Sequence, residues 1–182
     1  GMGWNYDEEH LSILEYILAS FEGKMVIDAD GLNTLVGHLD LLESSKARFV
    51  LTPHLKEFSR LTDLSIEEIE RNKISIALNF AREHHVILVL KGHTTIVTDG
   101  IDVYLCECGG AGMATSGSGD VLSGILAGML GYLDYDLLTV SAGVILNGIA
   151  GEIAEDKNTD ISMIASDTIN SISDAIKRIR SE

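Results

Sequence analysis

Apolar residues recur at helical spacing along the first half of the chain. Residues 7–21 and residues 32–39 carry apolar side chains three or four positions apart, which predicts two amphipathic helices. Ser65 followed by Glu68 matches a capping box and predicts a third helix that runs to about Glu83. The inward positions of this helix are predicted to be Ile66, Ile69, Ile76 and Phe80.

Short apolar runs alternate with these helices and predict strands. Residues 25–27, 49–52 and 86–90 are such runs, and the last is almost wholly Val, Ile and Leu, which is typical of a strand covered on both faces. Residues 94–98 and 101–106 flank Asp-Gly, a strong hairpin signal. The pattern therefore predicts an α/β fold whose mixed sheet binds ligands at the carboxyl ends of its strands.

The second half of the chain begins with a glycine-rich stretch. Residues 109–119 are mostly Gly, Ala, Ser and Thr, and helical spacing then resumes. We predict helices over about 121–133, 137–155 and 167–180. The first of these helices would begin directly at the glycine loop.

Composition and charge narrow the choice of partners. The 28 acidic and 13 basic residues give a net charge of −15, which repels phosphate backbones and anionic membranes. No uninterrupted apolar run approaches the ~20 residues that span a bilayer. The two cysteines, Cys106 and Cys108, have no second pair, which argues against structural zinc and a disulfide scaffold. We expect a cytoplasmic protein of one domain, with neither nucleic acid nor membrane as a partner.

Four loops at predicted strand or helix ends collect the polar residues. Three of them follow strands, at residues 28–33, 52–57 and 91–95. The fourth, Gly117–Asp120, offers backbone N–H groups and the positive end of a helix dipole, which favours an anionic ligand such as a phosphate. Neither a Walker A motif nor the Rossmann glycine pattern is present at this position.

Several of these polar residues allow two interpretations. Asp120 is either an N-cap or a general base beside a phosphate site. Lys91 ends an apolar strand, and we favour phosphate binding over a structural salt bridge. His54 and Glu57 either bind a ligand or form a solvated turn and first helical turn. Asp28 and Asp30 are either metal-linked acids or loop caps.

Four segments carry a joint resemblance: Val26–Asn33 (VIDADGLN), Leu51–Glu57 (LTPHLKE), Val89–Thr95 (VLKGHTT) and Gly112–Leu122 (GMATSGSGDVL). In order and spacing they resemble the ADP/ATP-dependent NAD(P)H-hydrate dehydratases, a branch of the ribokinase-like fold. The later segments Asn147–Gly151 and Ala165–Asp167 are also similar to that family. The resemblance implies one ribokinase-like domain over residues 1–182, a three-layer α/β/α fold with a mostly parallel central sheet and an antiparallel hairpin.

The resemblance also implies a metabolite repair enzyme. Such enzymes use ADP or ATP to dehydrate the S epimer of hydrated NADH or NADPH, by phosphorylating the hydroxyl and then eliminating phosphate. By position, Asp120 would be the base and would contact the substrate together with His54, Asp30 and Asn33. Mg²⁺ would accompany the nucleotide, organised through water by Glu57. The residues expected to hold the adenine nucleotide are Lys91, Gly92, His93, Thr94, Thr95, Gly117 and Gly119.

Two other functions compete with this one. The first is a ribokinase-like kinase of a vitamin precursor or sugar. Relatives that phosphorylate the thiamine pyrimidine resemble Thr-Pro-Asn where this chain has His54, and their glycine loop ends in Cys where it has Asp120. Both differences favour the dehydratase. The second alternative is a non-catalytic relative that binds nucleotide without turnover.

The chain departs from the family pattern at its N-terminus. Family members begin with a Lys-Gly-x-x-Gly segment, a strand and a glycine-rich substrate-binding stretch, all before the region that resembles residues 1–5. We therefore expect an N-terminally truncated domain with an exposed sheet edge. Such a chain would form a homo-oligomer or bind a complementing N-terminal segment.

Overall fold

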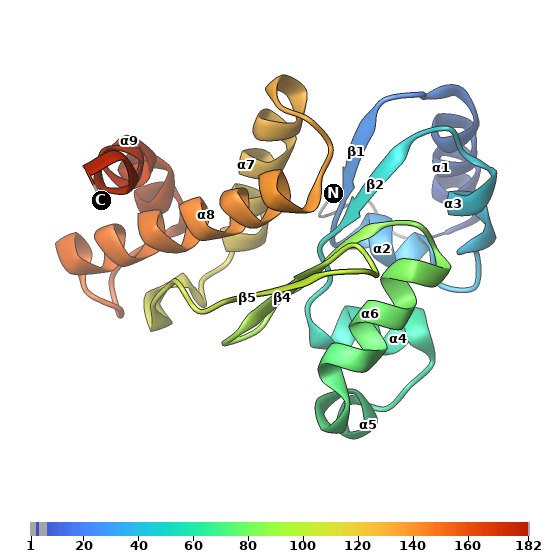
Figure 1. The fold of residues 1–182 in the computed structure, drawn as a ribbon, viewed down its shortest axis with the longest axis horizontal. Helices are drawn as coiled ribbons and strands as arrows, with labels where there is room; N and C mark the ends of the chain where they lie inside the picture. Colours follow the sequence, from blue (N-terminus) through green and yellow to red (C-terminus); the bar gives the residue numbers. More distant parts are fainter. Residues whose placement is uncertain (1–2, 4–6, 182) are drawn as a thin grey trace.

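The computed structural model describes residue 3 and residues 7–181; residues 1–2, 4–6 and 182 lie outside the described part. Its centre is a five-stranded sheet in the order β1-β2-β3-β4-β5 (Figure 1). The strands are β1 (Lys24–Ile27), β2 (Arg48–Leu51), β3 (Ile87–Leu90), β4 (Thr95–Thr98) and β5 (Val103–Cys106). Strands β1 to β3 pair in parallel, whereas β3–β4 and β4–β5 pair antiparallel. Of the described strands β4 alone runs against the others, so the expected mostly parallel sheet with a hairpin is confirmed.

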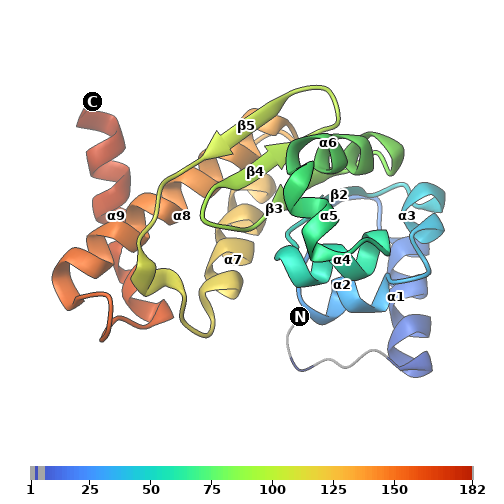
Figure 2. The ribbon, with the colours of Figure 1, turned by 90° about the horizontal axis from the view of Figure 1, so that it is seen from below.

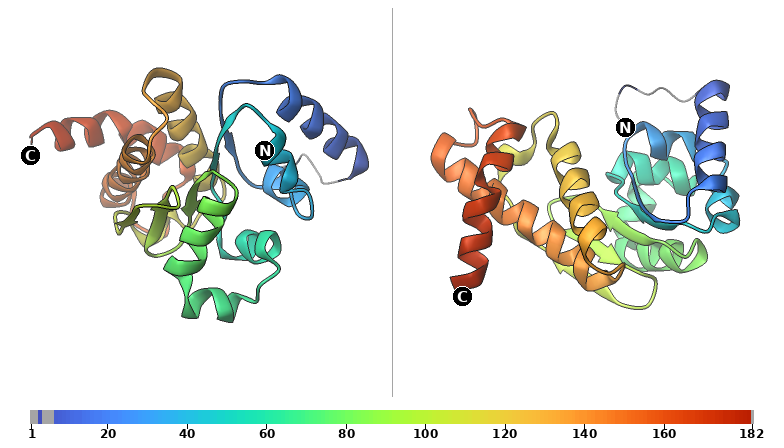
Figure 3. Two further views of the ribbon diagram at one scale, coloured as in Figure 1. Left: turned by 45° about the vertical axis from the view of Figure 1, so that its right-hand side comes forward. Right: turned by 90° about the horizontal axis from the view of Figure 1, so that it is seen from above.

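Helices cover both faces of this sheet, because successive strand residues point to opposite sides. Phe49 and Leu51 pack into one apolar cluster and Val50 into the other. The two sets of helices lie on opposite sides of the strands in Figures 2 and 3, which confirms the three-layer fold. On the first face lie α1 (Glu8–Ser20), α2 (Asp30–Thr34), α3 (Asp40–Ser44), α4 (Leu55–Thr62), α5 (Ile66–Arg71) and α6 (Lys73–Glu83). On the second lie α7 (Ser118–Tyr132) and α8 (Leu137–Asn158), with α9 (Ala165–Ser181) packed outside α8 and a short 3₁₀ turn, η1, at Ala111–Met113.

Two predicted helices are interrupted. Of the helix expected over residues 32–39 only the start forms: α2 ends at Thr34, a turn follows in which Gly37 has a φ of +80°, and the separate helix α3 begins at Asp40. The helix expected from Ser65 to Glu83 is divided into α5 and α6 at Asn72. Its capping box is present, but Ile66, predicted to face inward, is 37% exposed. Ile66 lies in the first turn, beside the cap, and faces solvent because the short α5 packs against the core through Ile69 instead.

The hairpin turn is longer than expected. Thr98 pairs with Val103, so four residues rather than two connect β4 and β5. The Asp99 carboxylate accepts hydrogen bonds from the backbone N–H groups of Ile101 and Asp102, both at 2.9 Å. Gly100 has a φ of +89°. The Asp-Gly signal therefore located the turn, and the Asp side chain sets its length.

Helix α8 is the one described helix that is long and apolar enough to cross a membrane, with 22 residues and a mean hydropathy of 1.6 in its most apolar window. However, 61% of that window is buried inside the protein. It packs between α7 and α9 (Figure 2). Its apolar residues are thus those of an interior helix.

Candidate functional site

A cavity of about 1020 Å³ opens at the carboxyl ends of β1, β2 and β3. The loops after these strands line it on one side, and the first turn of α7 lines it on another. The sequence-predicted residues that line it are His54, Glu57, Lys91, Gly92, His93, Thr95, Gly117, Gly119 and Asp120. Parallel strands bring these loops together although they lie far apart in the chain.

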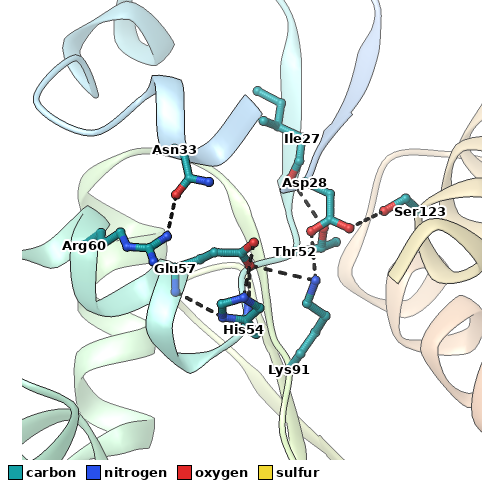
Figure 4. Close-up of polar contacts among 9 residues, drawn as sticks. All are labelled: Ile27, Asp28, Asn33, Thr52, His54, Glu57, Arg60, Lys91 and Ser123. Carbon is teal, nitrogen blue, oxygen red and sulfur yellow. Dashed lines mark hydrogen bonds and ion pairs between the residues drawn. The ribbon is translucent and has the colours of Figure 1, made fainter. Parts of the chain in front are cut away.

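An ion pair lies in this cavity. The Lys91 Nζ donates to Asp28 Oδ1 at 2.8 Å, and Ser123 Oγ of α7 donates to Asp28 Oδ2 at 3.0 Å (Figure 4). The exposed fractions of the side chains are 22% for Lys91 and 11% for Asp28. The pair therefore ties the ends of β1 and β3 to α7, and it gives Lys91 a protein partner in addition to any ligand.

His54 and Glu57 form a capping box at the start of α4. The His54 N–H donates to Glu57 Oε2 at 2.8 Å, and the Glu57 N–H donates to His54 Nδ1 at 3.1 Å. Beyond the strand ends, the Lys91 N–H donates to Pro53 O at 2.9 Å. Glu57 Oε2 lies 4.0 Å from Lys91 Nζ, so this carboxylate is buried between a helix cap and a cation (Figure 4). His54 and Glu57 do form a first helical turn, but Glu57 is buried rather than solvated, and both residues line the cavity.

The first turn of α7 approaches the ion pair closely. Gly117 has a φ of +91° and occupies the N-cap position, where no side-chain hydrogen bond caps the helix. A Cβ at Gly119 would lie 3.2 Å from Asp28 Oδ2 and 3.6 Å from Lys91 Nζ. Asp120 is exposed in the first turn and lines the cavity. The N-cap interpretation of Asp120 is therefore wrong, because the cap lies three residues earlier.

Three predicted site residues do not line this cavity. Thr94 instead donates from Oγ1 to Glu107 Oε1 at 3.4 Å. Asn33 lines a second cavity of about 470 Å³, where its Oδ1 accepts from Arg60 Nη1 at 2.8 Å. Asp30 opens α2 and lines neither cavity. Asp30 and Asn33 lie on α2, whereas Thr94 directly precedes β4.

Other residues of the cavity were not among the predicted site residues. Ser118 lies on the first turn of α7 and Asn147 on α8, and both line the cavity, whereas Ser123 of α7 contacts the cavity only through its hydrogen bond to Asp28. Within the described residues, Ser118 Oγ and Asn147 Oδ1 are buried without a hydrogen-bond partner. The sequence pattern did not separate Asp28 from Asp30. The position of Asp28 directly after β1 was the signal that distinguishes it.

The cavity offers neither a direct metal cluster nor a reactive thiol. Among the described residues, no group of three or more His, Cys, Asp or Glu side chains could hold a metal ion. Cys108 lines the cavity, and burial followed by the nearby Glu152 raises the pKa of its thiol. A raised pKa disfavours the nucleophilic thiolate. The chemistry of the cavity is therefore that of carboxylates, a lysine and backbone N–H groups.

Comparison with known proteins agrees with this arrangement. The family model for NAD(P)H-hydrate dehydratase matches residues 1–175. The chain belongs to the NAD(P)H-hydrate dehydratase family. The resemblance inferred from four motifs is thus confirmed.

Relatives of this family show how much of their length the chain covers. The bifunctional NAD(P)H-hydrate repair enzyme Nnr of Thermofilum pendens is 34% identical over the whole chain, which spans 35% of that relative. The ADP-dependent (S)-NAD(P)H-hydrate dehydratase of Cenarchaeum symbiosum is 33% identical over 86% of the chain and 53% of its own length. The chain therefore spans about a third of the curated relatives that it matches first.

Solved structures share the fold. The ADP/ATP-dependent NAD(P)H-hydrate dehydratase of Bacillus subtilis, co-crystallised with ATP and Mg²⁺, superposes with a TM-score of 0.84 at 25% identity, covering 97% of this chain and 62% of that one. A hydroxyethylthiazole kinase from Pyrococcus horikoshii superposes with a TM-score of 0.59 at 16% identity, covering 95% and 76%. The kinase alternative thus has the fold in common with this chain.

Proposed function

We propose that this protein dehydrates the S epimer of hydrated NADH or NADPH with ADP or ATP as co-substrate. The observation that carries the proposal is that Asp120, Lys91 and the N-terminus of α7 line one cavity in a chain of this family. A carboxylate next to an anion-binding helix end suits proton removal from a hydroxyl group that is being phosphorylated.

In this mechanism Asp120 accepts the proton of the substrate hydroxyl as its oxygen attacks phosphorus. The bound nucleotide supplies the terminal phosphoryl group. Lys91 and the backbone N–H groups of Gly117 and Gly119 hold phosphate oxygens and stabilise the charge that develops on them. Phosphate then leaves with the electrons of the C–O bond, and the adjacent ring carbon gives up a proton to restore the double bond.

The residues present fit Mg²⁺ through water rather than directly. Both oxygens of Asp28 are engaged, by Lys91 and by Ser123. One oxygen of Glu57 accepts from the His54 N–H and the other lies 3.4 Å from His54 Nε2. Mg²⁺ retains several waters when it binds nucleotides. We therefore assign Glu57 to the water shell of that ion.

The other predicted residues are assigned by position. His54 uses Nδ1 in the capping box, and we propose that the rest of its ring contacts the hydrated nicotinamide. Gly92, His93 and Thr95 line the cavity, and we propose that they contact the nucleotide. Thr94 is proposed to support that loop through its hydrogen bond to Glu107. Asp30 and Asn33 are proposed to act on the substrate side, next to the second cavity. Asn33 lines that cavity.

Absorbance at 340 nm tests the proposed activity. The purified chain is mixed with hydrated NADH, Mg²⁺ and either ADP or ATP, and mixtures without nucleotide or without protein are the controls. Nucleotide-dependent recovery of the reduced nicotinamide signal is expected. No recovery by a chain that binds nucleotide in calorimetry would contradict the dehydratase and favour the kinase or the non-catalytic relative.

We also propose that residues 1–182 act as one domain in the cytoplasm, within a homo-oligomer or with a complementing N-terminal segment. Both cysteines are free thiols, as in a reducing compartment. Helix α9 leaves Ile169, Ile176 and Ile179 exposed, which favours self-association. Sedimentation is expected to show an oligomer, and a monodisperse monomer that binds little hydrophobic dye would contradict self-association.

A further inference from the structure

Asn147 is a polar residue of the cavity that the proposed mechanism does not use. It lies on α8, whereas the other polar groups come from the strand ends and α7. Its exposed fraction is 8%, and its Oδ1 has no hydrogen-bond partner within the described residues. Buried polar atoms without a partner are rare and call for an explanation. Because Asn147 lines the cavity, a ligand is the natural partner.

The wall beside Asn147 is built from glycines held in place by α8. The Gly109 N–H donates to Glu152 Oε1 at 3.0 Å, and the Gly112 N–H donates to Glu155 Oε2 at 2.8 Å. A Cβ at Gly148, next to Asn147, would lie 2.6 Å from Cys108 Cβ. The segment 108–112 is therefore packed directly against this part of α8.

Apolar residues also line the cavity near Asn147. Val144 lies about one helical turn before it on α8, and Leu122 comes from α7; both line the cavity. Glycines and apolar side chains together provide a surface that suits a flat ring. The Asn147 amide beside this surface can then form hydrogen bonds with the polar atoms at the edge of that ring.

We propose that Asn147 reads the base of the nucleotide and selects adenine. A side-chain amide carries an acceptor and a donor, which match the exocyclic amine and the N7 ring nitrogen of adenine. In hypoxanthine and guanine a carbonyl oxygen replaces that amine while N7 remains an acceptor, so the amide cannot pair with both groups in either orientation. This inference rests on the proposed function, because it requires a nucleotide in this cavity.

Calorimetric titration of the purified full chain with ADP, IDP and pyrophosphate tests the inference. We expect the wild type to bind ADP at least about tenfold more tightly than IDP, as one paired base contact predicts. Asn147→Ala should bind ADP and IDP equally, with unchanged affinity for pyrophosphate. Should that variant fail to fold, equal wild-type affinity for ADP and IDP would still overturn the inference.

Ser141→Ala is the matched control. Ser141 also lies on α8, is buried, and has an Oγ without a partner within the described residues, but it does not line the cavity. This variant should keep the wild-type preference for ADP. Loss of the preference in Ser141→Ala as well would show that it reflects general packing of α8 and would overturn the role of Asn147.

The remaining outcomes separate this inference from the proposed function. Equal wild-type affinity for ADP and IDP, or a preference that persists in Asn147→Ala, overturns base reading and leaves the dehydratase standing. No wild-type binding of ADP, IDP or pyrophosphate overturns both. A preference abolished by Asn147→Ala, in a protein that never restores NADH, supports base reading and contradicts the dehydratase.

Discussion

The two ends of the parallel strands differ in whether their polar groups have hydrogen-bond partners. At the amino end, Tyr135 lies between β2 and β3, where its hydroxyl donates to Phe49 O at 2.7 Å and accepts from the Ile87 N–H at 3.2 Å. At the carboxyl end, Asp28 and Lys91 are paired, but the cavity around them also contains Ser118 Oγ, which has no hydrogen-bond partner in the described part of the chain.

This difference indicates that the amino end contributes mainly to stability and the carboxyl end mainly to ligand binding. At the amino end Tyr135 satisfies backbone groups of β2 and β3, so its hydrogen bonds contribute to the stability of the folded state. At the carboxyl end some polar atoms have no partner among the described residues, and the cost of burying them is recovered when a ligand binds. Substitutions at the two ends should therefore change different measured quantities.

The largest effect is expected for Asp120→Asn. The amide cannot accept the proton of the substrate hydroxyl, so turnover should fall about 10²- to 10⁴-fold. Nucleotide affinity and the unfolding midpoint should stay close to wild type, because Asp120 is exposed and the backbone groups of α7 remain. Asp134→Asn, an exposed acid outside the cavity, is the control. Undiminished turnover in Asp120→Asn would remove Asp120 as the base.

Lys91→Ala should lower both the affinity for nucleotide and the free energy of unfolding, because Lys91 belongs to the ion pair and to the proposed phosphate site. Loss of a charged hydrogen-bond donor should weaken nucleotide binding about 10- to 100-fold in calorimetry. The Asp28 carboxylate, left without its cation, should lower the free energy of unfolding by about 1–3 kcal/mol.

Lys46→Ala is the control for Lys91→Ala. Lys46 pairs with Glu22 at the surface, where both side chains are exposed. Exposed pairs contribute about 0–1 kcal/mol, so binding and unfolding should hardly change. An unchanged nucleotide dissociation constant in Lys91→Ala would mean that Lys91 serves only the ion pair.

Tyr135→Phe should lower stability and leave turnover intact. Removing the hydroxyl leaves the Phe49 carbonyl and the Ile87 N–H without their partner, which should cost about 1–3 kcal/mol in urea unfolding. Tyr132→Phe, on a side chain that is 92% exposed, should change neither quantity. A loss of activity at full stability would contradict the separation of the two ends.

The smallest effect concerns pH. Burial raises the pKa of Tyr135 to about 12, whereas the ordinary tyrosine pKa is 10.0. The folded state thus favours the neutral phenol, and this contribution is complete below pH 10 and is lost as the pH rises towards 12. The difference in unfolding free energy between wild type and Tyr135→Phe should therefore shrink over this interval. A constant difference would show that the buried phenol does not titrate as described.

Periodicity predicted the strands and most helices because one residue every two or 3.6 positions must face the core. It did not predict the breaks at Gly37 and Asn72, where tertiary packing ends a helix that the pattern would continue. The same limit applies to the site. The motifs located the loops, but they did not predict the pairing of Asp28 with Lys91, which lie 63 positions apart. Asn147 was not predicted because its sequence neighbours are those of any interior helix.

The most direct test of the central claim is the ratio of phosphate released to NADH recovered. Hydrated NADH, Mg²⁺ and the nucleotide are mixed with the purified chain, and NADH absorbance and inorganic phosphate are followed in the same sample. The account predicts one phosphate for each NADH, because the hydroxyl is phosphorylated before it leaves. NADH formed without phosphate, or phosphate formed without NADH, would contradict it.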